Sequence, residues 1–452
     1  MFILNLFNEG TRGGGDSYMH YLFAHWSFVH PHLFFDHWGK PLFTILSSPF
    51  AQFGFKGAVT FNILVAIGSG ILVNLSAKRM GVNFSWLGII ITVFTPLFFV
   101  LSFSSLTEIL FAFTLVLSIY LFVLQKFEWS AIVISFIPFA RTEGVIFLPL
   151  FALTFILLKN YKSVFTLLTG GVIMALLGYS VHKDFFWPIT KNPYQGSSSI
   201  YGSGDLFHFL HEAPGIFGWP LICAFFLGIA AMVITIFKQK DRKFALESFL
   251  IVGCSVGYFL AHTVVWAYGI GASAGLTRVM AGIVPLVALT GMYGLSYFVE
   301  AVKWSDRKKA VLLSVLALVF VIEGTTKNKF PLESKQVDKT VVEACHYILK
   351  EDLKKEYIVY YNPLEAFTLE LDPFSNDRSR ERVLNINEPS MDLSPGSIII
   401  WDSQFGPVEG GLTKETLVND PELNFVKRFI APNEFNGKEY FDFEVLIFQK
   451  RP

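Results

Sequence analysis

The chain has 452 residues, a formal net charge of +0 at pH 7 and a mean hydropathy of +0.50. Only 16% of its residues are charged, against about 25% in soluble domains, and 53% are hydrophobic. This composition excludes a protein that is soluble over its whole length. The balanced charge gives no indication of nucleic-acid binding.

The charged residues are unevenly distributed. Residues 327–452 hold 38 of the 72 Asp, Glu, Lys and Arg residues, and the much longer first part holds the other 34. The sequence therefore predicts an α-helical polytopic membrane body over residues 1–326, followed by a small soluble domain over residues 327–452. The three cysteines are far apart, so their spacing predicts neither a disulfide framework nor a metal site.

The chain begins with an apolar stretch, residues 1–7, that is too short for a transmembrane helix. We interpret it as the end of a truncated first span. Either the true start lies upstream or the protein works without a complete first span. The stretch has no basic region or cleavage site, so we do not expect a signal peptide.

The first loop, residues 8–56, is rich in aromatic residues that suit helices lying at the membrane interface. Asp16 follows three glycines there. This carboxylate either caps a helix over 17–29 or serves as a base at the membrane surface. Histidines are frequent between residues 20 and 37, but their spacing matches no metal-binding motif, and we expect no metal.

Lys40 lies between Trp38 and an apolar run. Its side chain either reaches to the interface or binds the phosphate of a lipid-linked substrate. Asp36 and His37, just before it, are further candidates for substrate binding.

Apolar runs of about 18 residues or more predict membrane-spanning helices. Such runs occupy residues 57–77, 84–103, 107–125, 163–181, 216–237, 245–267, 278–301 and 309–325. Two shorter runs, 129–140 and 145–158, are joined by Arg141, Thr142, Glu143 and Gly144. We predict that they form a helical hairpin, which gives about nine to eleven membrane helices in all.

Positive residues fall at alternate connections between these spans, which predicts that those connections are cytoplasmic. The other side of the membrane then holds the first loop, the turn at 104–108, the loops 182–215 and 268–277 and the soluble domain.

Four charged candidates lie at or near this non-cytoplasmic face. Glu108 opens a span, either as a first-turn acid stabilised by the helix dipole or as a second acid of a site. Arg278 either anchors lipid headgroups or clamps a phosphate. Arg141 and Glu143 either pair with each other or contact a ligand.

The soluble part has an α/β pattern. Residues 337–349 have helical periodicity, whereas residues 357–361, 397–401 and 443–449 are typical of strands. No nucleotide-binding or nucleophile-elbow motif occurs in this part.

Taken together, these motifs resemble the GT-C superfamily of polytopic glycosyltransferases over roughly residues 8–300. The resemblance is carried by Gly15-Asp16-Ser17-Tyr18, His37-Trp38-Gly39-Lys40-Pro41-Leu42, Ser105-Leu106-Thr107-Glu108, Ala140-Arg141-Thr142-Glu143-Gly144 and Thr277-Arg278-Val279-Met280. The second segment is similar to the Lys-Pro-Pro-Leu signature of the aminoarabinose and protein-mannosyl transferase-like branch. Ser17 stands where many members carry a second acid, so Asp36 and Glu108 are candidates to supply that carboxylate.

The resemblance implies an inverting glycosyltransferase of the non-cytoplasmic membrane face. Its donor would be a sugar on a polyprenyl phosphate, with mannose as one candidate, and its acceptor a glycan, lipid or protein. In this interpretation Asp16 is the base, Glu108 assists, and Lys40 and Arg278 bind phosphate. No cofactor is required, because the phosphate is already a good leaving group. The absence of a retention signal favours a bacterial inner membrane.

Two other classes fit the same residues. A transporter or flippase of lipid-linked saccharides would bind its substrate through them without cleaving a bond, but no internal repeat is seen. A non-catalytic assembly subunit would instead use the soluble domain as an interaction module.

Overall fold

A computed structural model describes residues 1–193, 202–270, 273–431 and 443–452 of the chain. Parts of the predicted loops 182–215 and 268–277 therefore lie outside the described residues. The chain divides into two compact units. The first unit comprises residues 1–6 and 32–330, and the second comprises residues 7–31 and 331–452.

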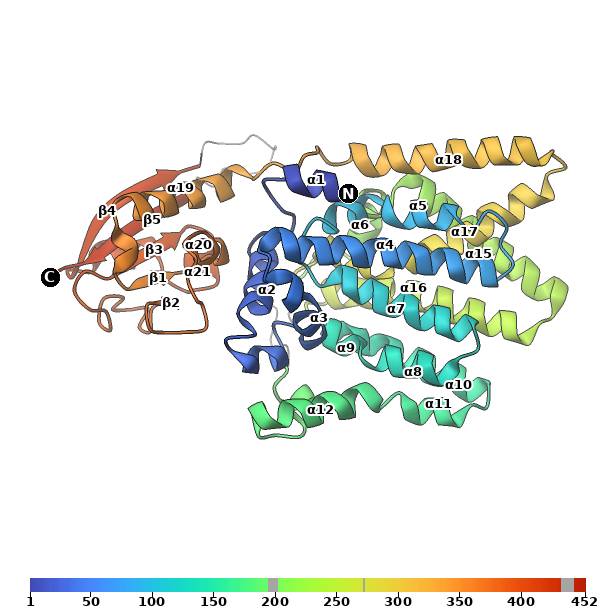
Figure 1. Ribbon diagram of the computed structural model, residues 1–452, viewed down its shortest axis with the longest axis horizontal. Coiled ribbons are helices and arrows are strands. Elements are labelled where there is room, and N and C mark those ends of the chain that lie inside the picture. The colour runs from blue at the N-terminus through green and yellow to red at the C-terminus, as the bar shows by residue number, and fades with distance from the viewer. Residues whose placement is uncertain (194–201, 271–272, 432–442) are drawn as a thin grey trace. The chain divides into compact units, whose positions relative to one another are not determined.

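The first unit is a helical bundle whose long helices run side by side (Figure 1). Among the described residues, six helical segments are long and apolar enough to cross a membrane. They are α4 (Phe55–Arg79), α11 and α12 together (Tyr161–His182), α15 (Trp219–Gln239), α16 (Arg242–Ala267), the 3-10 helix η3 with α17 (Thr277–Ala301), and α18 (Asp306–Thr326). The segment of η3 and α17 is the most buried, with 89% of its apolar window inside the protein, so it forms the centre of the bundle.

Shorter elements complete this unit. They are α1 (Phe2–Phe7), α3 (Pro41–Ala51), α5 (Leu87–Val93), α6 (Pro96–Leu101), α7 (Glu108–Val123), α8 (Phe127–Ser135), α9 (Ile137–Ala140), η2 (Thr142–Ile146), α10 (Phe147–Leu157), α13 (Trp187–Thr190) and α14 (His208–Ile216). The 3-10 helix η1 (Pro31–Phe35) lies where the two units meet along the chain. All of the predicted spans are helical, but not every span is one continuous helix.

The span expected over 84–103 is broken. Helix α5 ends at Val93 and α6 starts at Pro96, with Thr95 in an extended conformation between them. A proline disfavours helical backbone in the residue before it and cannot donate its own backbone hydrogen bond, so the single helix was a wrong prediction. The short runs at 129–140 and 145–158 are confirmed as helices that pack against each other, with Arg141 extended at the turn.

The second unit contains one five-stranded sheet with the order β2-β1-β3-β5-β4. Its strands are β1 (Ile358–Tyr360), β2 (Ser379–Glu381), β3 (Ile398–Asp402), β4 (Leu423–Ile430) and β5 (Glu444–Lys450). The pairs β1–β2 and β1–β3 are parallel, whereas β3–β5 and β4–β5 are antiparallel. The central strand β3 is buried along its whole length, which explains its apolar run from Ile398 to Trp401.

Helices surround this sheet within the second unit. They are α2 (Gly14–Trp26), α19 (Gln336–Lys350), the 3-10 helix η4 (Leu353–Lys355), α20 (Pro363–Thr368), α21 (Phe405–Val408) and α22 (Lys414–Asn419). The first of them, α2, comes from the N-terminal loop and packs against α20. Residues 7–31 thus share one compact unit with the C-terminal residues, an association that the charge pattern did not indicate.

Candidate functional site

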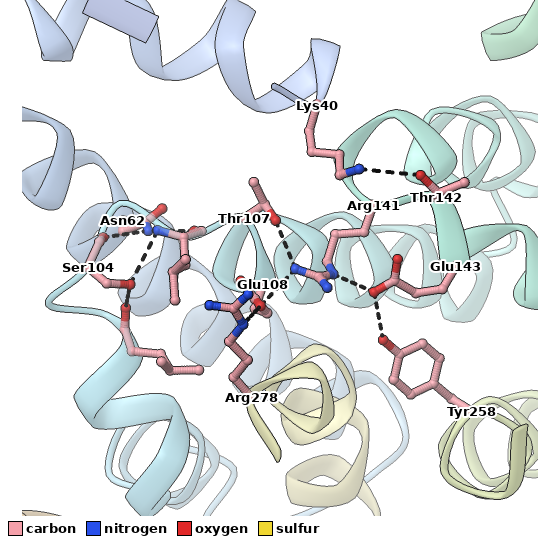
Figure 2. A network of polar contacts seen from close by, with 12 residues as sticks. Lys40, Asn62, Ser104, Thr107, Glu108, Arg141, Thr142, Glu143, Tyr258 and Arg278 are labelled. Carbon is pink, nitrogen blue, oxygen red and sulfur yellow. Dashed lines mark hydrogen bonds and ion pairs between the residues drawn. The ribbon is translucent and has the colours of Figure 1, made fainter. Parts of the chain in front are cut away.

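Glu108 joins two arginines in the interior of the first unit. It is the first residue of α7, and its side chain is 0% exposed. Its Oε1 atom lies 2.7 Å from Nη1 of Arg141 and 3.2 Å from Nε of Arg278 (Figure 2). The hairpin turn, the start of α7 and the 3-10 turn before the central helix α17 thus meet at one carboxylate.

The backbone before Glu108 is fixed by Asn62 of α4. The Nδ2 atom of Asn62 donates to the carbonyl oxygens of Ser104 and Leu106, at 2.7 and 2.8 Å. Ser104 and Leu106 lie in the turn that connects α6 with α7. Both residues are buried, as is Asn62. Because a buried carbonyl without a partner is costly, Asn62 stabilises the turn that presents Glu108.

Arg141 is held on both sides by carboxylates. Its Nε atom pairs with Oε1 of Glu143, which confirms the mutual ion pair expected at the hairpin turn. Its Nη1 atom also donates to Oγ1 of Thr107, at 3.0 Å. The extended backbone of Arg141 turns its side chain toward the start of α7 (Figure 2). Because Glu108 and Glu143 both contact it, Arg141 links the start of α7 with the hairpin turn.

Helix α16 contributes two further side chains that the sequence analysis did not place here. The hydroxyl of Tyr258 donates to Oε1 of Glu143 at 3.5 Å, and its ring lies 4.4 Å from the ring of His262. Both lie in a long apolar span whose polar residues resembled ordinary core residues in the sequence. Only their spacing of one helical turn indicated that they share a face.

Lys40 lies beside this cluster, and its side chain is directed into the protein. It is only 6% exposed, and its Nζ atom donates to the carbonyl of His37 at 3.1 Å and to Oγ1 of Thr142 at 3.5 Å. An amine that reached out to the interface would be exposed, so that alternative is wrong. The backbone φ of Lys40 is +63°, a strained conformation for a residue with a side chain. Such strain is often found at functional positions.

The turn before Lys40 is stabilised by Asp36. Its Oδ1 atom accepts hydrogen bonds from the backbone amides of Trp38 and Gly39, at 2.8 and 2.9 Å. Thr44 of α3 then donates from Oγ1 to the carbonyl of Gly39 at 2.9 Å. The structure therefore gives Asp36 a role in shaping the Lys40 loop.

Trp187 of α13 packs under the same loop. It is fully buried, and its ring lies 5.2 Å from that of His37 and 4.6 Å from that of His182, on which it stacks. Its Nε1 atom donates to the carbonyl of Met174 at 3.1 Å. His37 thus contributes its backbone carbonyl to Lys40 and its ring to the Trp187 contact.

Asp16 belongs to the second unit. It lies in the first turn of α2, where a carboxylate interacts favourably with the helix dipole. The N-cap is Gly13, so the helix starts earlier than expected and the capping role for Asp16 is wrong. Of the eight candidate residues, seven lie in the first unit, and Asp16 alone lies in the second.

Chemically, the cluster of the first unit suits an anion. It brings together three cations, Lys40, Arg141 and Arg278, and two carboxylates, Glu108 and Glu143. Among these five groups the cations outnumber the carboxylates by one, and burial strengthens their electrostatic interactions. Over the described part of the chain, no three His, Cys, Asp or Glu residues gather as a metal site.

The fold and this cluster define a polytopic helical membrane protein with a small sheet domain, and comparisons with solved structures agree. Over 99% of its length the chain resembles ArnT from Cupriavidus metallidurans in the apo state, with a TM-score of 0.62, 10% sequence identity and 95% of that chain covered. It also resembles the same ArnT bound to undecaprenyl phosphate, with a TM-score of 0.61, 11% identity and the same coverage of both chains.

The expected fold, a polytopic helical membrane body with a small α/β domain, is therefore confirmed, and it is similar to that of ArnT. No model of a known protein family matches the sequence, and no curated protein matches it either.

Proposed function

We propose that the protein is an inverting glycosyltransferase that moves a sugar from a polyprenyl-phosphate donor to a glycan, lipid or protein acceptor. The observation that carries this proposal is the buried cluster around Glu108, which gathers Lys40, Arg141 and Arg278. It is supported by the similarity of the fold to an ArnT structure that holds undecaprenyl phosphate. A lipid-linked phosphate supplies the anion that such a cluster would bind.

In the proposed complex, Lys40 and Arg278 bind the phosphate of the donor. Lysine contributes a compact charge, and arginine contributes a fork of donors that matches phosphate oxygens. Arg141 completes the positive field, while Glu108 and Glu143 hold both guanidinium groups in place. Glu108 therefore assists by orienting cations, because its oxygen already lies against two of them.

Asp16 takes the role of base in this proposal. It accepts the proton of the acceptor hydroxyl as the hydroxyl oxygen attacks C1 of the sugar. The bond between C1 and the phosphate oxygen breaks, and the polyprenyl phosphate leaves with the bonding electrons. Attack from the face opposite the phosphate inverts the configuration at C1. The reaction needs no metal in principle, because Lys40 and Arg278 stabilise the leaving phosphate.

The sugar and the side of the membrane are proposed from the sequence. Mannose is one candidate sugar. The distribution of positive residues predicts that the site and the C-terminal domain face the non-cytoplasmic side, and we propose a bacterial inner membrane as the location.

The test is sugar transfer by the purified protein in lipid nanodiscs. A panel of radiolabelled polyprenyl-phosphate sugars would be combined with extracted cell-envelope acceptors. We expect transfer from one donor, and we expect Asp16→Asn to lower kcat by about 10²- to 10⁴-fold, the usual contribution of a general base. The exposed Asp392 of the second unit provides the matched control, since Asp392→Asn should transfer sugar at the normal rate.

Two results would contradict parts of the proposal. Full activity of Asp16→Asn would remove Asp16 from the role of base. Binding of a donor by the wild-type protein without any transfer would instead favour a transporter of lipid-linked saccharides.

A further inference from the structure

Helix α2, which carries Asp16, packs against the C-terminal residues through its aromatic side chains. Tyr18 and Tyr21 lie one turn apart and share the ring of Phe367 in α20, at centroid distances of 5.0 and 5.6 Å. Two residues further on, the ring of Phe23 lies 4.7 Å from that of Phe374. These three side chains of α2 are buried, so the helix is packed in place along its length.

The far end of this segment is held by a hydrogen bond between His30 and Asp372. The Nε2 atom of His30 lies 2.7 Å from Oδ2 of Asp372, and its ring lies 6.2 Å from that of Phe374. Both partners are about four-fifths buried. The segment from α2 to His30 is therefore anchored to the residues that follow α20.

The near end is held by a close approach at Gly15, next to Asp16. A Cβ atom on Gly15 would lie 2.8 Å from Cζ of Phe405 in α21 and 3.3 Å from Cδ of Pro363 in α20. A carbon atom does not fit at 2.8 Å without displacing its neighbour. With a larger residue at position 15, the ring of Phe405 or the first turn of α2 would have to shift.

The two helices that contact Gly15 are fixed by a buried polar network at the end of the sheet. Asp402, the last residue of β3, accepts from the backbone amides of Gln404 and Phe405 with Oδ1 and from Nδ2 of Asn362 with Oδ2, at 3.0 Å for the last contact. Glu365 caps the start of α20 by accepting from the amides of Tyr361 and Asn362. Because β1 and β3 are parallel, their carboxyl ends meet here.

A continuous chain of contacts thus leads from the sheet to the first turn of α2. Asp402 sets the position of Phe405, and Phe405 lies against Gly15, one residue before Asp16. Burial raises the pKa of both Glu365 and Asp402, and the neighbouring Asp402 carboxylate raises that of Glu365 further. Burying two carboxyl groups costs free energy. Here both groups accept hydrogen bonds from backbone amides and thereby fix the starts of α20 and α21.

We propose that the C-terminal domain is a positioning element of the transfer reaction: through Phe367, Phe374, Asp372 and Phe405 it holds the helix that carries Asp16. This inference rests on the proposed role of Asp16 as base. It assigns to the domain a function other than acceptor binding, because none of these four residues needs to touch a substrate. They act through α2.

The test is a compensating pair of substitutions. Gly15→Ala should push α2 away from Phe405 and lower kcat by about 10- to 100-fold, since a displacement on the order of 1 Å has effects of this size. The KM for the donor should stay the same, because the donor phosphate is assigned to Lys40 and Arg278. Phe405→Leu removes the Cζ atom that the new methyl group would meet. The double variant should therefore recover most of the lost kcat.

Hydrogen exchange provides a readout that needs no activity. The amides of α2 should exchange faster in Gly15→Ala and return to wild-type rates in the double variant. Gly171→Ala in α12 is the control, because a Cβ there meets no atom within 4 Å. It should change neither the exchange of α2 nor the activity.

The possible failures can be told apart. If the wild type transfers sugar and Asp16→Asn does not, but Gly15→Ala retains the full kcat, the positioning role is wrong and the proposed function stands. If Gly15→Ala lowers kcat and Phe405→Leu does not restore it, the contact does not transmit the effect, and the positioning role is wrong. A third outcome is that no donor is used, while hydrogen exchange in α2 rises in Gly15→Ala and returns to normal in the double variant. The contact between α2 and Phe405 is then confirmed, but the proposed function is wrong, and so is the positioning of a base.

Discussion

At the scale of single residues, Glu108 is the buried carboxylate that contacts both arginines of the site. Its Oε1 contacts Arg141 and Arg278, and no part of its side chain is exposed. Removing one partner of a buried ion pair leaves an uncompensated charge, at a cost of about 3–5 kcal/mol. We expect Glu108→Gln to lower the free energy of unfolding in lipid by roughly this amount. Thermal or steric-trap unfolding would measure it.

The matched control is Glu128→Gln. Glu128 pairs with Lys162 at 2.9 Å, but the two side chains are 45% and 75% exposed. Exposed pairs of this kind contribute about 0–1 kcal/mol. Equal losses of stability in the two variants would show that the Glu108 cluster contributes no more than a surface ion pair.

At the scale of elements, the short helix α13 supports the Lys40 loop through Trp187. The ring of Trp187 supports His37, whose carbonyl accepts from Lys40. We expect Trp187→Leu to shift this loop and to lower kcat/KM for the donor by up to about 100-fold, the effect of a displacement near 1 Å. Transfer assays over a range of donor concentrations would measure the change.

Trp129→Leu is the corresponding control, since Trp129 is 62% exposed on α8. It should leave kcat/KM unchanged. A similar loss in both variants would indicate a general effect of replacing tryptophan in the membrane body.

The elements that the sequence predicted best were those with a local signal. Long apolar runs gave the spans, and alternating or β-branched runs gave three strands close to β1, β3 and β5. The short edge strand β2 and the mostly exposed strand β4 were missed, because neither has a continuous apolar run. The break in the span at 84–103 depends on Pro96, a signal that was present in the sequence.

The site was predictable to the extent that charge within an apolar run is itself a signal. Glu108, Arg141, Glu143 and Arg278 stood out for this reason, and the structure brings these four together. Trp187 gave no such signal, because an aromatic residue beside a membrane span is ordinary. Its role depends on contacts with residues about 150 positions earlier, which no local pattern encodes.

At the scale of the whole molecule, the positive residues predict which connections face the cytoplasm. In a Cys223→Ser background, we expect a membrane-impermeant maleimide to label Asn387→Cys in intact spheroplasts. Lys303→Cys should react only after the membrane is opened. Both positions are exposed, and the other two natural cysteines are buried. Labelling of Lys303→Cys in intact spheroplasts would reverse the predicted orientation.

The separation between α2 and its partners along the chain has a consequence for biosynthesis. His30 and Asp372 are 342 residues apart, so α2 leaves the ribosome long before the residues that it packs against. At about 5–20 residues per second, this delay lasts roughly 17–70 s. During that time the rings of Phe367 and Phe374 are not yet available to α2, and aromatic side chains such as Tyr18 and Tyr21 are favoured at the membrane interface. The helix that carries Asp16 thus reaches its final packing only when synthesis is nearly complete.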